Sequence, residues 1–585
     1  MNRSHKSPFT LILAIALFLT TSSYARAQEN KSAPDKEEIA ALREKALKLI
    51  DSVAGQLNTL QSAENRARMG ANIVDSLWKH DEERARSLLR VVQEDIKTEL
   101  QKRDRETRYD VRYNVFLKLR HDTIERIAKY DGQAAWDFLK VTEPAFENQE
   151  PYEFRANEQT LELSLAKQIA ANNPDVALKL GRQALRQSLN PDVLKVLSRL
   201  NRKHKEQAQV LYKEIVGKLP DADLAETWNN REFVRSLVRT YQPPDVDELT
   251  YRELIGLVVT IALERGCGKK PAREEDESDG LCEWAASTLN GAERYDSRIT
   301  RITPWFPAEM ESWRFAGVYE EAQELLQERA YDELEALAAK YPQLQEGIYG
   351  QAIFYAMSDG NMDQVRKMID RLSSQNIEKG QALLAQVERY EKKTPVTAER
   401  LAEIQAEIEL IPESRARADS LLTVASQLGA IDQKASLKFL DRAREVIDTL
   451  KPGKDQTQAQ LGLAMVYCQQ KSERGFAIME SLLPKLNELV EVAVKLDGYD
   501  TSYLRDGEWN MSASGGIGEI LTMLSESAGA FAWSDFDRAV TLASQFDRPE
   551  IRLMAHLKLA QSVLAGPSQT LGLMTRHPLQ LSYRW

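Results

Sequence analysis

The stretch RADSLLTVASQLGAIDQKASLKFLDRAREVIDTL, residues 417–450, predicts two consecutive α-helices joined by a short turn. Apolar side chains recur every three or four residues in each half, the spacing that places them on one face of a helix. They are Leu421, Leu422, Val424, Ala425 and Leu428 in the first half, and Ala435, Leu437, Phe439, Leu440, Ala443, Val446, Ile447 and Leu450 in the second. Similar pairs recur through most of the chain, so the sequence specifies an architecture before it specifies an activity.

The pair around Asp81 supplies a template for these repeats. Apolar residues precede Asp81, a small residue lies four positions after it, and a further apolar stripe follows. The same order fits with Asn173 or Lys471 as the origin, with Asp535 except for Ser527, and at Asp432 with a shift of one residue. The small residues are Ala85, Ala177, Gly475, Ala539 and, after the shift, Ala435.

Helix packing explains the template. We expect the second helix to cross the first most closely where the small residue lies, because a short side chain lets two backbones approach. Asp or Asn at the turn predicts an N-cap. A lone pair cannot bury both of its apolar faces, so such units are expected to stack on one another.

This hairpin pattern resembles tetratricopeptide-like and related α-solenoid repeats, over roughly two thirds of the mature chain. The Trp…Leu-Gly…Tyr signature of tetratricopeptides is absent from these units and their spacing is irregular, so armadillo-like or HEAT-like pairing stays open. The resemblance implies an all-α fold, a right-handed-type α-solenoid of stacked helical hairpins. It also implies a scaffold that binds a protein or peptide partner.

The N-terminus reads as a secretory signal peptide. Arg3 and Lys6 form a positive region, residues 11–19 (LILAIALFL) form an apolar region, and Ala25 and Ala27 flank Arg26 in a cleavage pattern. The apolar run is too short to span a bilayer, which needs about 20 residues. The sequence therefore predicts export to the periplasm or the medium, with cleavage after Ala27.

The charge of the chain argues against nucleic acid as a partner. The formal net charge is −11, and loss of three positive charges with the signal peptide makes it −14. Residues 254–263 (LIGLVVTIAL) form the most apolar later run, and we expect them to be buried in a helix because they are too few to span a membrane. The oligomeric state is left open.

The three cysteines fall into two groups. Cys267 and Cys282 bracket a loop, and in an exported protein they could form a disulfide or remain two separate thiols. Cys468 lies inside an apolar helical pattern and is expected to be a small core residue.

Breaks in the helical pattern divide the chain. We expect a signal peptide at 1–27, helical repeats at 28–265, an irregular segment with the main boundary at 266–307, further helical repeats at 308–565 and an irregular tail at 566–585. Alternating β-branched runs do not occur at useful length, so no strands are expected.

We predict no catalytic, cofactor-binding or metal-binding residues. His121 and Glu125 share a helix face, yet no third ligand lies nearby in sequence, so a solvated pair is expected. The acidic run at 273–280 lacks the final carboxylate of an EF-hand loop, and the glycine-rich run at 512–518 lacks the Gly-Lys-Ser/Thr end of a phosphate-binding loop.

The aromatic group formed by Trp305, Phe306 and Trp313 is the candidate ligand contact. Exposed aromatic side chains could stack on sugar rings or hold a peptide, whereas buried ones would wedge a helix junction beside Pro304 and Pro307. A non-catalytic scaffold for a protein or peptide is the leading hypothesis. The alternative is an all-α protein that binds or cleaves polysaccharide through this central segment.

The C-terminus breaks the repeat pattern. Residues 557–560 match 422–425, which belong to the first helix of a pair, but no second helix follows in the tail. We therefore expect a chain truncated or read out of frame after about Ala565, with the apolar face of Leu557 and Leu559 partly uncovered. An ordinary flexible tail is the alternative.

Overall fold

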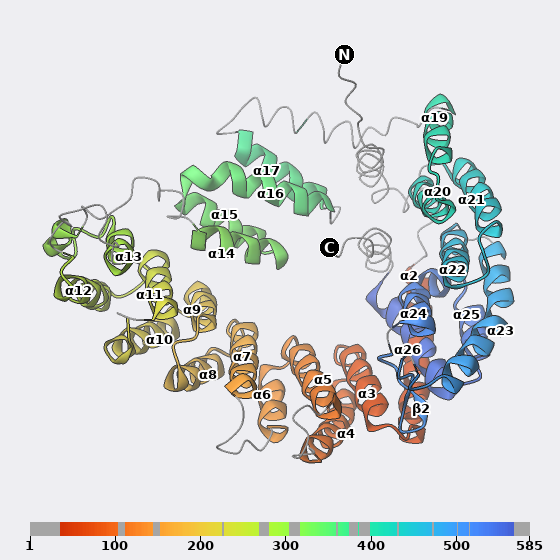
Figure 1. Cartoon of the computed structure of the whole chain (residues 1–585), viewed down its shortest axis with the longest axis horizontal. Helices are drawn as coiled ribbons and strands as arrows, with labels where there is room; N and C mark the ends of the chain where they lie inside the picture. Colours follow the sequence, from red (N-terminus) through yellow and green to blue (C-terminus); the bar gives the residue numbers. More distant parts are fainter. Residues whose placement is uncertain are drawn as a thin grey trace. The chain divides into compact units, whose positions relative to one another are not determined.

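Helices form most of the chain (Figure 1), so the protein is an all-α solenoid of stacked helical hairpins, as predicted. No helix in the ranges given below is both long enough and apolar enough to cross a bilayer. The computed structural model describes residues 36–566 apart from 103–110, 144–151, 225–226, 268–279, 303–315, 359–360, 374–383, 385–397, 430–431, 471–472, 500 and 514. The predicted signal peptide and nearly all of the predicted tail lie outside these residues.

The stretch at 417–450 forms the helices α20 (Ser414–Leu428) and α21 (Gln433–Asp448). Asp432 begins α21, because its carboxylate accepts a hydrogen bond from the backbone N–H of Ala435 at 2.9 Å. The buried hydroxyl of Ser436 donates to the carbonyl of Ala425 at 2.6 Å, which joins the two helices where they cross. The predicted apolar stripes of both helices meet in one core.

The small residue of the template lies where two helices approach most closely, as the pair of α22 (Lys454–Gln469) and α23 (Glu473–Lys495) shows. A Cβ added to Gly475 would lie 2.6 Å from the carbonyl oxygen of Ala464 and 2.9 Å from the backbone nitrogen of Cys468. Both neighbours are backbone atoms, which cannot move aside as a flexible side chain could. Cys468 is buried, as expected of a core residue.

The predicted N-caps are confirmed at Asp81 and Asp535 as well as at Asp432, and the prediction is wrong at Asn173. Asp81 and Asp535 accept hydrogen bonds from backbone N–H groups three residues later, at 3.0 and 3.1 Å. The Asn173 side chain makes no capping hydrogen bond. It lies beside Gly132 instead, where an added Cβ would be 2.6 Å from Asn173 Nδ2.

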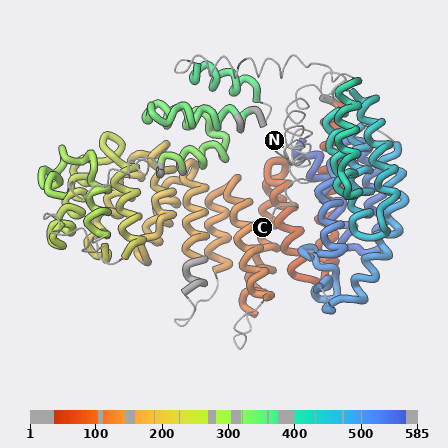
Figure 2. Tube along the Cα trace, turned by 45° about the horizontal axis from the view of Figure 1, so that its top comes forward, coloured from red at the N-terminus to blue at the C-terminus, as the bar shows by residue number. Residues whose placement is uncertain are grey.

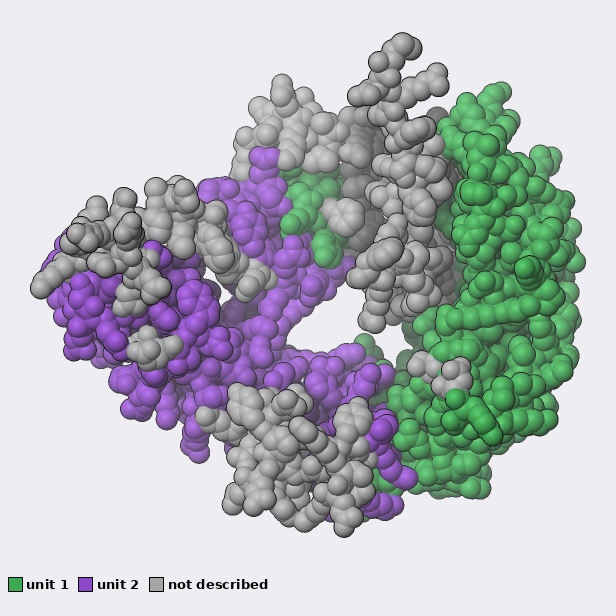
Figure 3. Space-filling view, viewed as in Figure 1, with its two compact units in different colours: residues 1–99, 349–585 green, residues 100–348 purple. Residues whose placement is uncertain are grey.

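The chain divides into two compact units (Figure 3): unit 1 is Met1–Glu99 with Tyr349–Trp585, and unit 2 is Leu100–Ile348. This division differs from the predicted main boundary, because residues 266–307 lie inside unit 2. Unit 2 contains α5 (Val111–Ala128), α6 (Gly132–Val141), α7 (Tyr152–Ile169), α8 (Pro174–Gln187), α9 (Asp192–Lys203), α10 (Lys205–Lys218), α11 (Trp228–Thr240), α12 (Glu248–Glu264), α13 (Gly280–Leu289), α14 (Ala316–Gln327) and α15 (Tyr331–Lys340).

Unit 2 stacks its helices in two layers. Helices α5, α7 and α9 pack side by side in one layer, and α8, α10 and α12 pack in the other. Each helix also packs against its neighbour in sequence, so α7 pairs with α8 and α9 with α10. Residues 254–263 belong to α12 and bury Leu254, Ile255, Val258, Val259 and Ala262, as predicted for a core segment. Short 3₁₀ turns, η2 (Leu219–Asp221) and η3 (Ser297–Arg301), occur between helices.

Unit 1 combines helices from both ends of the chain. Its helices are α2 (Lys36–Gly55), α3 (Ala63–Leu77), α4 (Glu82–Gln101), α17 (Met362–Ser373), α19 (Ala398–Glu409), α20 to α23, α24 (Gly516–Ser534), α25 (Phe536–Ala543) and α26 (Pro549–Ala565), with η1 (Leu57–Thr59). Helix α16 (Gln345–Ser358), preceded by η6 (Pro342–Leu344), spans the division between the units. One layer runs through α20, α22, α24, α26 and α3.

Helix α2 occupies the place of the second helix that α26 lacks (Figures 1 and 2). It packs along α26 and is held on both sides by ion pairs, from Lys45 to Asp537 of α25 at 2.6 Å and from Asp51 to Arg84 of α4 at 2.5 Å. In the other layer, Gln561 of α26 donates to two groups of α3. The stack of pairs therefore continues from α26 into α2 and α3.

The expectation of an uncovered apolar face on α26 is wrong. Leu557 and Leu559 are only 3% and 4% exposed, because helices of this unit cover both sides of α26. The covering helix α2 lies near the other end of the sequence, so no sequence pattern next to Ala565 could predict it. Residues 567–585 lie outside the described part of the chain.

A short β-hairpin interrupts the helices where none was expected. Strands β1 (Leu504–Arg505) and β2 (Glu508–Trp509) pair antiparallel. Asp506 and Gly507 connect them, with φ of 52° and 80°, the pair of positive φ angles that a tight two-residue turn needs. The hairpin places Glu508 against α3 and Trp509 in the core, where it stacks on Tyr503 with ring centroids 5.4 Å apart.

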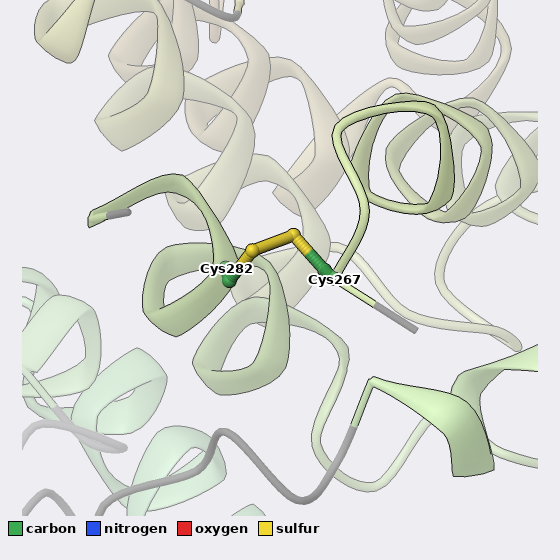
Figure 4. The surroundings of a disulfide bond; sticks show 2 residues. All are labelled: Cys267 and Cys282. Atoms are coloured by element: carbon green, nitrogen blue, oxygen red, sulfur yellow. A yellow bond between two sulfur atoms is a disulfide. The ribbon is translucent and has the colours of Figure 1, made fainter. Parts of the chain in front are cut away.

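Cys267 and Cys282 are joined in a disulfide that cross-links the end of α12 to the first turn of α13 (Figure 4). Their Cα atoms are 5.3 Å apart, within the usual range for such a bond. Both cysteines are buried. The bond therefore fixes the two helices on either side of residues 268–279.

Candidate functional site

Several residues singled out from the sequence lie outside the described part of the chain. These are the aromatic group Trp305, Phe306 and Trp313 and the cleavage residues Ala25 and Ala27. The structure therefore leaves the exposure of that aromatic group, and with it the polysaccharide hypothesis, as predictions.

His121 and Glu125 form the expected pair, with His121 Nε2 3.0 Å from a carboxylate oxygen of Glu125 and both side chains partly exposed. Among the residues that the structure describes, no three histidine, cysteine or carboxylate side chains are grouped so that they could hold a metal ion. The neighbourhood of this pair is of interest for another reason, because a polar recess opens beside Glu125.

This polar recess lies in unit 2 and has a volume of about 640 Å³. It is formed by three helices of one layer, α5, α7 and α9, and by the residue that follows α14. Its lining is almost wholly polar or charged: Asp122, Glu125, Arg126, Lys129, Ser164, Lys167, Gln168, Arg199 and Glu328.

Helical periodicity explains why these side chains converge. Asp122, Glu125 and Arg126 are spaced by three or four residues and share one face of α5, and Lys129, directly after the helix, continues that spacing. The opposite face carries Ile124, Ile127 and Ala128, which are all buried. Helix α7 repeats this arrangement, with Ser164, Lys167 and Gln168 on the recess side and Leu165 and Ile169 in the core.

Hydrogen bonds connect α5 and α7 where the two helices line the recess. Gln168 Nε2 donates to the carbonyl oxygen of Glu125 at 2.9 Å, and Ser164 Oγ donates to the Glu125 carboxylate at 3.4 Å. His121 contacts the same carboxylate. Glu125 is therefore fixed by groups from two helices, which positions an acceptor at a constant place in the recess.

Carboxylates of α14 and α15 face the cations of α7 and α9. Lys167 is 2.9 Å from Glu324, and Arg199 is paired with Glu328. Arg202 bridges Glu321 at 3.3 Å and Glu333 at 3.1 Å. Helix α14 is thus held against this layer of unit 2 by a series of ion pairs as well as by packing on α11.

Burial and charge act together on Arg199. Burial of its guanidinium, with the nearby positive charge of Arg202, lowers the pKa of Arg199, while the carboxylates of Glu324 and Glu333 oppose that change. The Nε atom of Arg199 is buried and has no hydrogen-bond partner. This buried donor therefore lacks the hydrogen bond that usually offsets its removal from water.

The recess suits recognition of polar groups. It combines four cationic side chains with three carboxylates. Lys129 is the exposed residue among the cations. Backbone amides and charged side chains of a peptide could find donors and acceptors of both kinds here. No sequence signal distinguished these residues, because a charged stripe opposite an apolar one is the ordinary pattern of a surface helix.

A second cavity, in unit 1, is small and apolar. It has a volume of about 50 Å³ and lies among α23, α24, α25 and α26, lined by side chains such as Met479, Phe531 and Leu559. Its size leaves room for no more than a small apolar group, so it is a packing defect of the core.

Comparisons with known proteins do not place the chain in a family. No protein-family model matches the chain, and no curated protein matches it. Solved structures that match include the crystal structure of yeast Tom70, at 13% identity with a TM-score of 0.18, over 89% of this chain and 96% of that one. Another is a circular tandem repeat protein with a novel repeat topology, at 13% identity with a TM-score of 0.12, over 91% and 98%.

Proposed function

We propose that this protein is an exported, non-catalytic helical-repeat scaffold that binds a segment of a partner protein in the polar recess of unit 2. The observation that supports it most directly is the recess itself, a volume of about 640 Å³ bordered by three helices of one layer and rich in donors and acceptors. A stacked layer of helices presents such a surface on a rigid frame.

The chemistry of the recess favours a peptide with both charged and neutral polar groups. Lys129 offers an exposed ammonium group, and Glu125 offers a fixed carboxylate next to it in the recess. Arg199 adds a guanidinium group that is paired with Glu328. A partner segment would contribute carboxylates and carbonyl oxygens to the cations and N–H groups to Glu125.

Export is supported by the predicted signal peptide and is compatible with the disulfide between Cys267 and Cys282. Disulfides persist in oxidising compartments and are rare in the cytosol of most organisms. Fusion of residues 1–27 to a reporter enzyme that is active only outside the cytoplasm tests this part of the proposal. An inactive reporter would contradict it.

Site-specific photo-crosslinking tests the binding surface. A photoreactive amino acid in place of Lys129 should capture the partner in cells, whereas the same group in place of Lys213, an exposed lysine of α10 in the other layer, should not. Lys129→Glu should reduce capture from a second position, Ser164, by roughly tenfold, because charge reversal at an interface commonly costs about 1.4 kcal/mol or more. Lys213→Glu should leave it unchanged. Equal capture at both lysines would refute the assignment.

A further inference from the structure

The end of α23 and the turn that follows it expose an apolar stripe. Val492, Leu496 and Tyr499 are 43%, 52% and 88% exposed. They are spaced by four and three residues, so Leu496 and Tyr499, in the turn after the helix, continue the spacing of the helix face that carries Val492. Earlier in α23 the apolar side chains are buried, as Phe476 and Leu486 are. The stripe is about 10 Å long, or two helical turns.

A recess of about 400 Å³ continues this stripe toward the start of the helix. Helix α23 contributes Leu483, Pro484, Asn487, Glu488 and Glu491, and the turn between α25 and α26 contributes Gln545 and Asp547.

The walls of this recess are fixed to each other through Asn487. Its Nδ2 atom donates to the carbonyl of Gln545 at 2.9 Å, and its Oδ1 atom accepts from the backbone N–H of Asp547 at 3.3 Å. The side chain of one helix therefore holds the turn that forms the opposite wall, so the recess is a built part of unit 1.

Negative charge dominates the recess. Glu488, Glu491 and Asp547 are exposed, and none of the three is in an ion pair with another described residue. Lys485 and Lys495 share this face of α23, and neither lines the recess itself. An occupant that covers this face must bring apolar groups for the stripe and positive charge for the carboxylates, since like charges brought together would be repelled.

We propose that Val492, Leu496 and Tyr499, together with Glu488, Glu491 and Asp547, form a docking surface for a basic amphipathic helix of a partner protein; we name it the α23 surface. A helix places apolar residues at the same three- and four-residue spacing along one face, so two turns of it match the stripe. Lysine or arginine on the flank of that helix reaches the three carboxylates. A membrane surface is disfavoured, because these carboxylates repel anionic lipid.

Peptide titration of the full chain tests the proposal. The probes are two synthetic peptides, (LKKLLKL)₂ and (LEELLEL)₂, which share one apolar pattern and differ only in the sign of their charge. Labelled at one end, each is titrated with the protein and followed by fluorescence anisotropy. The basic peptide should bind, and the affinity should fall with added salt, whereas the acidic peptide should not bind.

Matched variants separate the α23 surface from general attraction to an acidic protein. Val492→Ser with Leu496→Ser should weaken binding of the basic peptide at least tenfold, whereas Leu249→Ser, at a leucine that is 71% exposed in unit 2, should not.

The carboxylates have a control of equal charge. Glu488→Lys with Glu491→Lys should also weaken binding at least tenfold, and Glu37→Lys with Glu83→Lys, exposed carboxylates of α2 and α4, should change it far less. Thermal melts show whether each variant is folded.

The proposal is overturned if neither peptide binds, if both bind equally, or if the α23 variants and their controls behave alike. It does not depend on the proposed function, because the Lys129→Glu variant should bind the basic peptide normally.

Discussion

Glu508 accepts a hydrogen bond from the backbone N–H of Gln61 at 2.7 Å, although 447 residues separate the two in sequence. Its second carboxylate oxygen accepts from the backbone N–H of Ser62 at 3.0 Å, directly before α3. Backbone N–H groups at a helix start lack partners within the helix, and the helix dipole favours a negative charge there. The β-hairpin thus supplies a carboxylate that completes the start of α3.

Removal of this carboxylate should destabilise unit 1. We expect Glu508→Ala to lower the free energy of unfolding by about 1–3 kcal/mol, because the exposed N–H of Gln61 and the partly buried N–H of Ser62 lose their acceptors. Glu508→Gln keeps one acceptor oxygen, so its free energy of unfolding should lie between those of the natural protein and of Glu508→Ala. Urea denaturation measures the effect, with Glu83→Ala, at an exposed carboxylate of α4, as the control. Equal midpoints for Glu508→Ala and Glu83→Ala would contradict the role assigned to the hairpin.

Two glycines should respond in opposite directions to the same substitution. Gly475→Ala should destabilise the protein by about 1–3 kcal/mol, because the added Cβ meets the backbone of α22. Gly256→Ala should stabilise it by about 1 kcal/mol, because Gly256 lies inside α12 and an added Cβ there meets nothing within 4 Å. Thermal unfolding of both variants measures this contrast. A stable Gly475→Ala protein would show that α22 and α23 do not need their close approach.

His556 should make stability depend on pH. Burial, with help from the positive charge of Arg552, lowers the pKa of His556 below its usual 6.5. The unfolded chain therefore binds more protons than the folded one as the pH falls below about 6.5, and stability contributed by the neutral ring is lost on acidification. Its Nε2 atom lies 3.1 Å from Ser544 Oγ and 3.4 Å from the carbonyl of Val540.

The test compares melting temperatures between pH 8 and pH 5 for the natural protein and for His556→Gln. The variant should lose less stability over this range, because its amide keeps a donor for Val540 and does not titrate. Parallel pH profiles would show that other groups cause the dependence. His121→Gln is the control, since His121 is partly exposed and on a different unit.

The disulfide should contribute measurably to the stability of unit 2. Cys267→Ser with Cys282→Ser should lower the free energy of unfolding by about 3 kcal/mol, because the loop that the bond closes is 15 residues long. In that variant Cys468 is the remaining thiol, and burial raises its pKa to about 12. It should resist alkylation until unit 1 opens. Rapid alkylation of the native protein would contradict its burial.

Local structure followed from the sequence wherever neighbouring residues decide it. The pair at 417–450 could be predicted because its apolar stripes, the cap at Asp432 and the small residue at Ala435 all act within a few residues. The hairpin was missed although Asp506-Gly507 is a known turn signal, because its strands are too short to show alternation. The small residue at Gly475 was predicted correctly with its physical reason.

The candidate site was beyond prediction from the sequence for a different reason. The recess of unit 2 needs α5, α7, α9 and the end of α14 in one place, and residues such as Lys129 and Glu328 lie almost 200 positions apart. Each helix alone shows only the polar face that any surface helix has. The pairing of α2 with α26 could not be predicted for the same reason, because the apolar faces of these two helices meet only in the folded protein.

The pairing of α2 with α26 also has a consequence for the order in which the chain folds as it is synthesised. Unit 2 is one uninterrupted segment, so all of its contacts are available before residue 349 has been made. Helix α2 is among the first to emerge, yet its partner α26 follows about 500 residues later. At a typical rate of synthesis this is a wait of tens of seconds. Unit 1 can therefore close only after translation has passed α26, and its apolar N-terminal helices must stay unaggregated until then.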